Sequence, residues 1–510
     1  MIQLARLFDH GMTLQRQKPI RIWGSTDCPQ EVTVSLNGTI LVEKIPIAGG
    51  FSIELPAQEA VTDAVLTISG TEDVVELTGV DIGEVWVAGG QSNMEFLLRY
   101  DAEGEEQIRN ANDPHLRFYD VGEYTFEGEK SQTNKDNCEA WDRWMTFAPD
   151  TAEYFSAVGL YFAKVLRTAY DVPIAIIGCN WGGTTASAWT NESDLEEDPA
   201  LHVYLDEYRA ATKDLDREEY EKKHAEALTF LDSEEMKRAM RSVMYGNVSL
   251  WEIIKAIPLL GKIVKSGGMP VGPYNQNAPG VLYHNMLCQI AGVAVRGVIW
   301  YQGESDDQKA EVYDKLFSAM IRCWRNAWKE ELPFLFVQLA PFGKWLGSTG
   351  NKYPIVRQRQ EKVSKSVPGA YMVSIMDVGD PKDIHPKKKR PVGERLALLA
   401  RGKVYGEEIL CEAPEVCGGE VQDGRLVLRF LHAGEGLKIC GKKLDAISVT
   451  AEGKRVKSFQ ASATGDCLVI ISNAIRKDTE IEVAFAWEGY CEVNLYNSAG
   501  LPVKPFLWKN

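Results

Sequence analysis

The segment Gly89-Gly90-Gln91-Ser92-Asn93-Met94 constrains the fold of this chain more than any other part of its sequence. It follows the apolar run Val85-Trp86-Val87-Ala88, which is typical of a buried strand. Glycines allow a sharp turn and a close approach of the backbone to a ligand, and open α/β sheets bind ligands at the carboxyl ends of their strands. Ser92 is therefore a candidate nucleophile, and the alternative is a tight turn with a capping Ser92 or Asn93.

The alternation of apolar runs with amphipathic stretches predicts an α/β domain that begins near residue 81. Strands are expected at residues 84–88, 173–178, 296–301, 333–339 and 369–377, and helices at 155–169, 307–328, 353–366 and 391–404. Strands that alternate with helices indicate a parallel sheet covered on both faces.

Regions on both sides of this domain have the short alternating segments of β modules. Val32-Thr33-Val34-Ser35-Leu36 is followed by the turn signal Asn37-Gly38, and Leu426-Val427-Leu428-Arg429-Phe430 alternates in the same way. A highly charged stretch interrupts the α/β alternation and predicts an exposed helical insertion. The expected organisation is an N-terminal β module (1–80), an α/β domain (81–405) with a helical insertion (about 195–265), and a C-terminal β module (406–510).

The charge of the chain argues against some classes of partner. The formal net charge is −16 and no block of basic residues occurs, so neither nucleic acid nor an anionic membrane is an expected partner. No run of about 18 apolar residues is present, so no membrane-spanning helix is expected. The first residues lack the basic and apolar regions of a signal peptide. We therefore expect a cytoplasmic protein, or a periplasmic or secreted one if a signal peptide has been removed.

His385 is the candidate base. The chain has seven histidines, and the other six lie in β-module, charged or apolar contexts. His385 lies in Asp383-Ile384-His385-Pro386, after the last expected strand of the α/β domain and before its last expected helix. A base after a late strand can meet a nucleophile that follows the first strand, because both strand ends open onto the same crevice. A capping or surface histidine is the alternative.

Several motifs in order resemble the sialate O-acetylesterase family of SGNH (GDSL-like) hydrolases. Gly90-Gln91-Ser92-Asn93-Met94 resembles the first signature block, and the segment around Asp383-Ile384-His385-Pro386 resembles the last. Intermediate matches are Trp181-Gly182-Gly183-Thr184 with Trp189, Tyr274-Asn275-Gln276 with residues 280–286, and Trp300-Tyr301-Gln302-Gly303-Glu304-Ser305-Asp306. Residues 7–16 resemble an N-terminal module often found with these enzymes. The resemblance spans roughly residues 4–405 and implies a three-layer α/β/α SGNH-type domain with a parallel sheet, flanked by β modules.

The resemblance implies a serine esterase that removes O-acetyl groups from sialic acid through an acetyl-enzyme, with Ser92 as nucleophile and His385 as base. Another acetylated carbohydrate, such as acetylxylan, is an alternative substrate. A catalytically inactive carbohydrate-binding protein is the alternative of another class. No metal or cofactor is expected, and the ten cysteines form no Cys-x-x-Cys pair that would indicate a zinc site.

The acid that orients His385 departs from the family pattern. SGNH enzymes generally carry Asp-x-x-His, but Lys382 stands at that position and Asp383 is only two residues before the histidine. Glu304 is the second candidate and the one we favour, because the resembled family segment regularly carries this glutamate and the strand expected at residues 296–301 should end in the same crevice. A main-chain carbonyl is the third, since the main task is to hold the ring and its tautomer.

Acyl transfer needs fixed donors for the developing oxyanion. The resemblance implies the backbone N–H groups of Ser92 and Gly183 and the side chain of Gln302. A sialic acid also carries a carboxylate, for which a pocket arginine is expected. From the sequence, Arg99, Arg357, Arg390 or none of them has that role. Trp181, Trp189 and Trp300 are candidates for stacking on a sugar ring, and core packing is the alternative.

Overall fold

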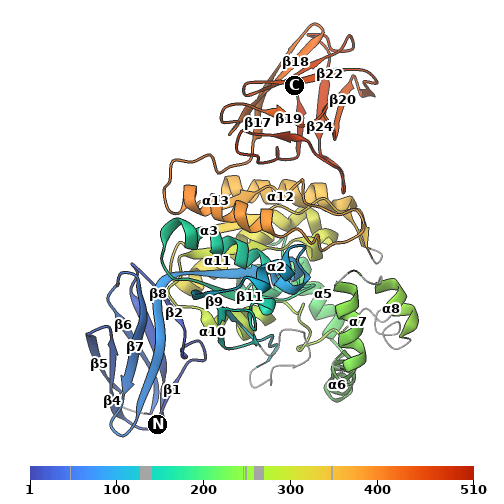
Figure 1. Ribbon diagram of the computed structural model, residues 1–510. Helices are drawn as coiled ribbons and strands as arrows, with labels where there is room; N and C mark the ends of the chain where they lie inside the picture. The colour runs from blue at the N-terminus through green and yellow to red at the C-terminus, as the bar shows by residue number, and fades with distance from the viewer. Residues whose placement is uncertain are drawn as a thin grey trace. The chain divides into compact units, whose positions relative to one another are not determined.

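The computed structural model describes residues 1–45, 48–126, 140–231, 233–244, 246, 250–257, 269–345 and 348–510 (Figure 1). The chain divides into two compact units. The first unit comprises Met1–Trp300 and Lys315–Phe334, and the second comprises Tyr301–Asp314 and Leu335–Asn510. Each unit has its own β module, and the domain limits expected from the sequence stay predictions.

The first unit begins with a β module, as the sequence predicts. Its strands are β1 (Ile2–Leu4), β2 (Thr13–Gln15), β3 (Ile20–Thr26), β4 (Gln30–Leu36), β5 (Thr39–Ile45), β6 (Gly49–Leu55), β7 (Val61–Ser69) and the start of β8 (Val74–Gly90). Asn37 and Gly38 take φ values of 49° and 80° between the paired residues Leu36 and Thr39. This is the two-residue hairpin turn that Asn-Gly favours.

Strand β8 continues without interruption from the β module into the larger sheet of the first unit. The last residues of β8 lie between β11 (Ile174–Asn180) and β12 (Gly297–Tyr301). Beyond β11, the strand order continues through β9 (Asp113–Asp120) to β10 (Trp144–Phe147). β11 is parallel to both β8 and β9, and every residue of β11 is buried. Such burial on both faces is typical of a central parallel strand.

The sequence predicts a parallel sheet, and the sheet that contains β8 is mixed. β10 pairs antiparallel with β9, and β7 pairs antiparallel with the first part of β8. An antiparallel neighbour needs no crossover helix, so it adds a strand where the helix-strand alternation gives no signal.

Helix α3 (Ala157–Tyr170) packs on β11 and β9 and ties the sheet to the segment that follows β8. The Ser156 hydroxyl accepts a hydrogen bond from the Gly159 N–H at 3.1 Å and donates to the Met94 carbonyl at 2.6 Å. One N-cap side chain therefore starts the helix and holds the residues next to Ser92.

The charged stretch forms helices as the sequence predicts. They are α5 (His202–Thr212), α6 (Arg217–Leu231), α7 (Glu234–Met244) and α8 (Leu250–Ala256), and residues 258–268 lie outside the described part of the chain. No helix in the described ranges is long and apolar enough to cross a membrane.

The second unit contains β16 (Ala370–Val373) and, from Leu335 onward, the neighbouring strand β13 (Phe334–Val337). Helices α12 (Tyr353–Ser366) and α13 (Arg390–Lys403), both labelled in Figure 1, pack on β16. The C-terminal β module follows as predicted. Its two four-stranded sheets contain β17 (Glu415–Gln422), β18 (Arg425–Leu431), β23 (Cys467–Ile471) and β22 (Gln460–Thr464) in one, and β21 (Lys454–Arg455), β20 (Ile447–Ala451), β24 (Ile481–Phe485) and β26 (Phe506–Lys509) in the other.

Two expected boundaries are wrong. Residues 304–312 form a 3-10 segment with non-helical dihedrals at Lys309, and α11 (Tyr313–Trp328) begins only after it. Strand β16 ends at Val373 although residues 374–376 remain buried. The apolar pattern used to predict the strand therefore reports burial, and the buried residues here extend beyond the residues that are hydrogen-bonded in the sheet.

Glu84 is a fully buried carboxylate at the point where β8 enters the larger sheet. It accepts hydrogen bonds from Arg16 at 2.6 Å, from Arg296 at 2.7 and 2.9 Å and from Gln15 at 3.2 Å. Burial tends to raise the pKa of Glu84, but these hydrogen bonds and the charge of Arg296 outweigh it and lower the pKa. The ionised carboxylate therefore links the β module to β8 and to the residue that precedes β12.

Replacing Glu84 by Gln is expected to lower the free energy of unfolding by about 3 kcal/mol at neutral pH, because two arginines then face a neutral amide. A lowered folded-state pKa means that this contribution is present above the unfolded pKa and is lost as pH falls through the folded pKa. The difference from the wild type should therefore shrink below about pH 4.

Denaturant unfolding between neutral pH and about pH 3 measures this difference. The control is Glu76→Gln, which changes an exposed carboxylate on the same strand and should have little effect. A loss for Glu84→Gln that is equal at both ends of the pH range would contradict the ionic role.

Candidate active site

Ser92 lies on a tight turn directly after β8. Gly90 takes φ 136°, and the short helix α1 (Ser92–Glu95) follows at once. Gly89 packs so closely on the rings of Trp300 and Trp324 that a Cβ atom would lie 2.8 Å from each. The turn predicted from the glycines is confirmed, and it places a half-buried serine at the carboxyl end of a central strand.

The loop after β11 lies against this serine. β8 and β11 are paired up to Gly90 and Asn180, and the Trp181 N–H donates to the Gly90 carbonyl at 3.1 Å. A Cβ atom on Gly182 would lie 3.2 Å from the Cβ atom of Ser92. Gly183 is exposed, takes φ 75° and has no atom within 4 Å of a Cβ position. The structure therefore brings Ser92 and the Gly182-Gly183 loop together, with open space beside Gly183.

Two side chains hold this loop in place, and sequence reasoning missed both. The Glu95 carboxylate accepts the Gly182 N–H at 2.7 Å. The Asn277 amide donates to the Gly183 carbonyl at 3.1 Å and accepts the Thr185 N–H at 2.9 Å. Glu95 is three residues from Ser92, and Asn277 follows Gln276 of the Tyr274-Asn275-Gln276 motif. Their closeness to these motifs is the feature of the sequence that could have identified them.

The segment that carries Asn277 also contacts the helical insertion. The Tyr274 N–H donates to the Tyr220 hydroxyl of α6 at 2.8 Å, and the ring of His224 lies 3.2 Å from the Tyr274 carbonyl through Nε2. Tyr220 and His224 are both buried. The insertion is therefore packed against the segment that fixes the Gly183 loop.

His385 belongs to the second unit, and Asp383 is a carboxylate beside it. Oδ1 of Asp383 accepts the backbone N–H of His385 at 2.8 Å and lies 3.6 Å from Nδ1 of the ring. Burial tends to raise the pKa of Asp383, but the interactions with His385 outweigh it and lower the pKa. The rings of Trp345 and His385 meet in a T-shaped contact with a centroid distance of 5.5 Å. The ring of His385 is only 13% exposed, so its orientation is constrained by these neighbours.

Gln302 and Glu304 also lie in the second unit. Gln302 is fully buried, with its Nε2 donating to Asp306 at 2.7 Å and its Oε1 accepting the Tyr313 hydroxyl at 2.9 Å. Glu304 is 8% exposed, and burial together with the Glu304 charge raises the pKa of Tyr301. The roles of Gln302, Glu304 and Asp383 stay predictions.

One arginine candidate for a substrate carboxylate is excluded. Arg357 is fully buried and donates to four backbone carbonyls. Burial lowers its pKa to about 10, which leaves it charged at neutral pH. Arg99 is 9% exposed and pairs with Glu153 at 3.3 Å, and Arg390 is 36% exposed and lies 3.7 Å from Glu394.

Other groups in the described structure fit catalysis less well. Nε2 of His284 lies 2.7 Å from Glu192, and this hydrogen bond raises the pKa of His284, which opposes the neutral form that a base needs. Cys179 is fully buried, and burial raises its pKa. Trp189 and Trp300 are buried core residues rather than sugar platforms. Within the described ranges no group of His, Cys, Asp and Glu side chains could hold a metal ion.

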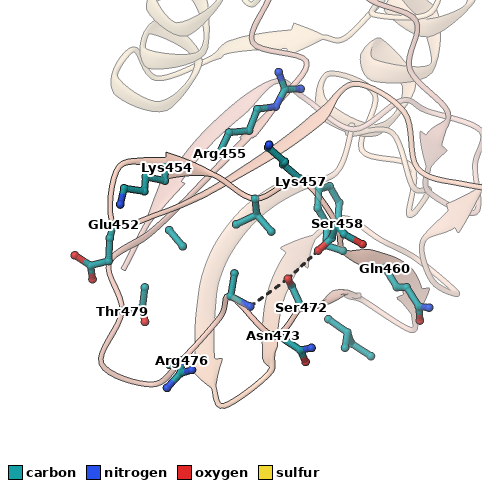
Figure 2. A pocket seen from close by; sticks show the side chains of 15 residues that line it. Glu452, Lys454, Arg455, Lys457, Ser458, Gln460, Ser472, Asn473, Arg476 and Thr479 are labelled. Atoms are coloured by element: carbon teal, nitrogen blue, oxygen red, sulfur yellow. Dashed lines mark hydrogen bonds between the residues drawn. The ribbon is translucent and has the colours of Figure 1, made fainter.

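A cavity of about 880 Å³ opens on the C-terminal β module (Figure 2). Lys454, Arg455, Lys457 and Arg476 line it, together with Ser458 and Ser472. The Ser472 hydroxyl donates to the Ser458 carbonyl at 2.8 Å. No histidine lines this cavity, so it offers no serine with a base and is not a candidate catalytic centre.

Comparisons with known proteins show which families and structures this chain resembles. Residues 260–400 match the family model for carbohydrate esterases described as sialic acid-specific acetylesterases. The sialate O-acetylesterase of Homo sapiens is 24% identical over 560 residues, covering 99% of this chain and 92% of its own. That of Rattus norvegicus is 24% identical over 448 residues, covering 80% and 74%. The crystal structure of a carbohydrate acetylesterase from Xanthomonas citri matches with a TM-score of 0.76 and 28% identity, covering 100% of this chain and 99% of its own.

These matches define the class of the protein, which is a carboxylic ester hydrolase. They also confirm the resemblance to the sialate O-acetylesterase family that the sequence motifs carry. The fold is an α/β domain with a large mixed sheet and flanking β sheets, and its structural relatives include a carbohydrate acetylesterase.

Glu95 provides a test of the Gly182-Gly183 loop. If the Gly183 N–H is an oxyanion donor, Glu95→Ala should lower kcat on p-nitrophenyl acetate by about 10- to 100-fold, because the loop loses the acceptor that holds it and the donor is displaced. Glu95→Gln keeps an acceptor oxygen and should retain most of the activity. Equal kcat values for Glu95→Ala and the wild type, with both folded by circular dichroism, would show that the loop needs no such anchor.

Proposed function

We propose that this protein is a serine esterase that removes O-acetyl groups from sialic acid through an acetyl-enzyme. The three-layer α/β/α SGNH-type arrangement is part of this proposal. The supporting observation is the half-buried Ser92 on a tight turn after a central strand, with the Gly182-Gly183 loop against it. The similarity to sialate O-acetylesterases over 99% of the chain supports the substrate class.

In this mechanism the Ser92 hydroxyl oxygen attacks the acetyl carbonyl while His385 accepts the hydroxyl proton. The tetrahedral intermediate collapses, and the protonated His385 gives its proton to the departing sugar oxygen. Water, deprotonated by His385, then attacks the acetyl-enzyme, and acetate leaves as Ser92 regains a proton. The acetyl group is thus transferred twice, first to Ser92 and then to water.

The oxyanion of each intermediate requires donors that are already oriented. The backbone N–H groups of Ser92 and Gly183 are the first two donors in the proposal. Both stand at the ends of paired parallel strands, and Glu95 and Asn277 fix the loop that presents Gly183. The amide of Gln302 is the third, and its bonds to Asp306 and Tyr313 would orient it for that task.

Replacing Ser92 by Ala should abolish ester hydrolysis and leave the fold intact, because the hydroxyl is the nucleophile and Ala fits the turn. A fluorophosphonate probe should label Ser92 in the wild type, as mass spectrometry of the labelled peptide would show. Label confined to another serine would overturn the assignment, and an unreactive wild type would favour an inactive carbohydrate-binding protein. Acetate release from acetylxylan with a higher kcat/KM than from O-acetylated sialic acid would favour the alternative substrate.

The acid that orients His385 can be identified by two matched variants. If Glu304 has this role, Glu304→Gln should lower kcat by about 100-fold or more, since the wrong histidine tautomer is then favoured. Asp383→Asn should cost much less, because Asp383 Oδ1 serves the backbone N–H of His385 and an amide oxygen can replace it. The measurement is kcat/KM on O-acetylated sialic acid.

The reverse order of losses would assign the role to Asp383, whose Oδ1 lies 3.6 Å from Nδ1 of His385. Small losses of activity for both variants would favour a main-chain carbonyl as the group that orients His385, with Ser92 and His385 acting as a catalytic dyad. Circular dichroism of both variants controls for folding.

A further inference from the structure

The loop that carries His385 is paired with a second segment of the same unit, residues 342–345. Phe342 and Asp380 form a parallel bridge, and the Lys344 N–H donates to the Pro381 carbonyl at 3.0 Å. Within the loop, Oδ1 of Asp380 accepts the N–H groups of Lys382 at 2.7 Å and Asp383 at 3.0 Å. The ring of Trp345 also meets the imidazole. The position of His385 therefore depends on the position of residues 342–345.

This segment is held in turn by the C-terminal β module. The Phe342 N–H donates to the Gly489 carbonyl at 2.8 Å. A Cβ atom on Gly489 would lie 2.6 Å from the Gly350 carbonyl oxygen and 3.0 Å from that of Phe342. The backbones of the module and of the segment are thus in direct contact, with no space for a side chain between them.

Arg357 of α12 joins the same two parts through its guanidinium group. It donates to the carbonyls of Leu339 and Ala340, just beyond β13, at 2.9 Å each. It also donates to the carbonyls of Glu488 and Gly489 in the C-terminal module at 2.8 and 2.9 Å. A charged donor makes stronger hydrogen bonds than a neutral one, and these four oxygens would lose a buried partner without it.

We propose that Arg357 and the Glu488-Gly489 turn of the C-terminal β module are positioning elements for His385. They fix residues 339–345, and these residues fix the loop that presents the imidazole. The inference rests on the proposed function, in which His385 moves the proton. It makes the C-terminal β module a part of the catalytic framework rather than an appended binding domain.

The contacts between the C-terminal β module and residues 339–345 explain why a change in the module should lower kcat. The links from Gly489 to Phe342, from Phe342 to Asp380 and from Lys344 to Pro381 are backbone contacts. A displacement of the backbone cannot be absorbed by a change of rotamer. A displacement of about 1 Å at a group that transfers a proton can cost about 100-fold in rate. Substrate contacts made elsewhere would be unaffected, so KM should change little.

The test compares Gly489→Ala with Gly418→Ala. Both glycines lie in the C-terminal module, but a Cβ atom on Gly418 has no atom within 4 Å, which makes it a matched control. On p-nitrophenyl acetate, Gly489→Ala should lose about tenfold or more in kcat with KM changed less than about twofold. Gly418→Ala should resemble the wild type. Thermal unfolding of each variant separates a positional effect from a loss of folded protein.

Arg357→Lys provides a second variant if Gly489→Ala does not accumulate as folded protein. Lysine keeps the charge but has three donors on one nitrogen instead of a planar fork, so it cannot serve both sets of carbonyls equally. It should lower kcat in the same way, with KM again nearly constant. A folded Gly489→Ala or Arg357→Lys protein with the kcat of Gly418→Ala would overturn the inference.

His385→Ala distinguishes this failure from a failure of the proposed function. If His385→Ala is inactive while Gly489→Ala matches the wild type, His385 remains the base and the positioning role is wrong. If His385→Ala retains full activity, the proposed function itself is wrong.

Discussion

The parallel pairing of β8 with β11 is the constraint on which the candidate nucleophile depends. The two strands stay in register to Gly90 and Asn180, so the chain segments that leave them begin side by side. One segment carries Ser92 and the other carries Gly182 and Gly183. Glu95 and Asn277 then complete the arrangement with hydrogen bonds to the glycine loop. The candidate nucleophile and a candidate oxyanion donor are thus brought together by backbone pairing rather than by flexible side chains.

Buried charges fix the framework within each unit. In the first unit, Glu84 is surrounded by Arg16, Arg296 and Gln15 where β8 enters the larger sheet. In the second, Arg357 is surrounded by backbone carbonyls. A charge without water is stabilised only when its partners are placed correctly, so each network favours one arrangement of its strands and turns. Such rigidity suits an enzyme whose donors must be oriented before the reaction.

The sequence predicts the local features of this protein well. The Asn37-Gly38 hairpin turn, the glycine turn before Ser92 and the helices of the insertion follow from residue types and spacing, which act over a few positions. The start of α11 is missed because Glu304–Val312 forms a 3-10 segment, which shares the apolar spacing of a helix only in part. The antiparallel edge strand β10 is missed because its pairing partner is not specified by its own residues.

Long-range hydrogen bonds account for what the sequence does not predict. Glu95 and Gly182 are 87 positions apart, and Arg357 and Gly489 are 132 apart, so no local pattern connects them. Arg357 illustrates the difficulty. The sequence offers it as a ligand for a substrate carboxylate, but in the fold it donates to backbone carbonyls. The candidate role of Ser92 follows from residue types in a short motif and stays a prediction. Roles that depend on packing became visible only in the structure.

The central claim is that Ser92 forms the acyl-enzyme, with the N–H groups of Ser92 and Gly183 stabilising the oxyanion. A crystal structure of the protein after reaction with a phosphonate ester would test it most directly, because the phosphonyl oxygen occupies the place of that oxyanion. The account predicts phosphorus bonded to the Ser92 hydroxyl oxygen and a phosphonyl oxygen within about 3 Å of both backbone nitrogens. A phosphonyl oxygen that points away from Gly183, or an adduct on a different residue, would contradict it.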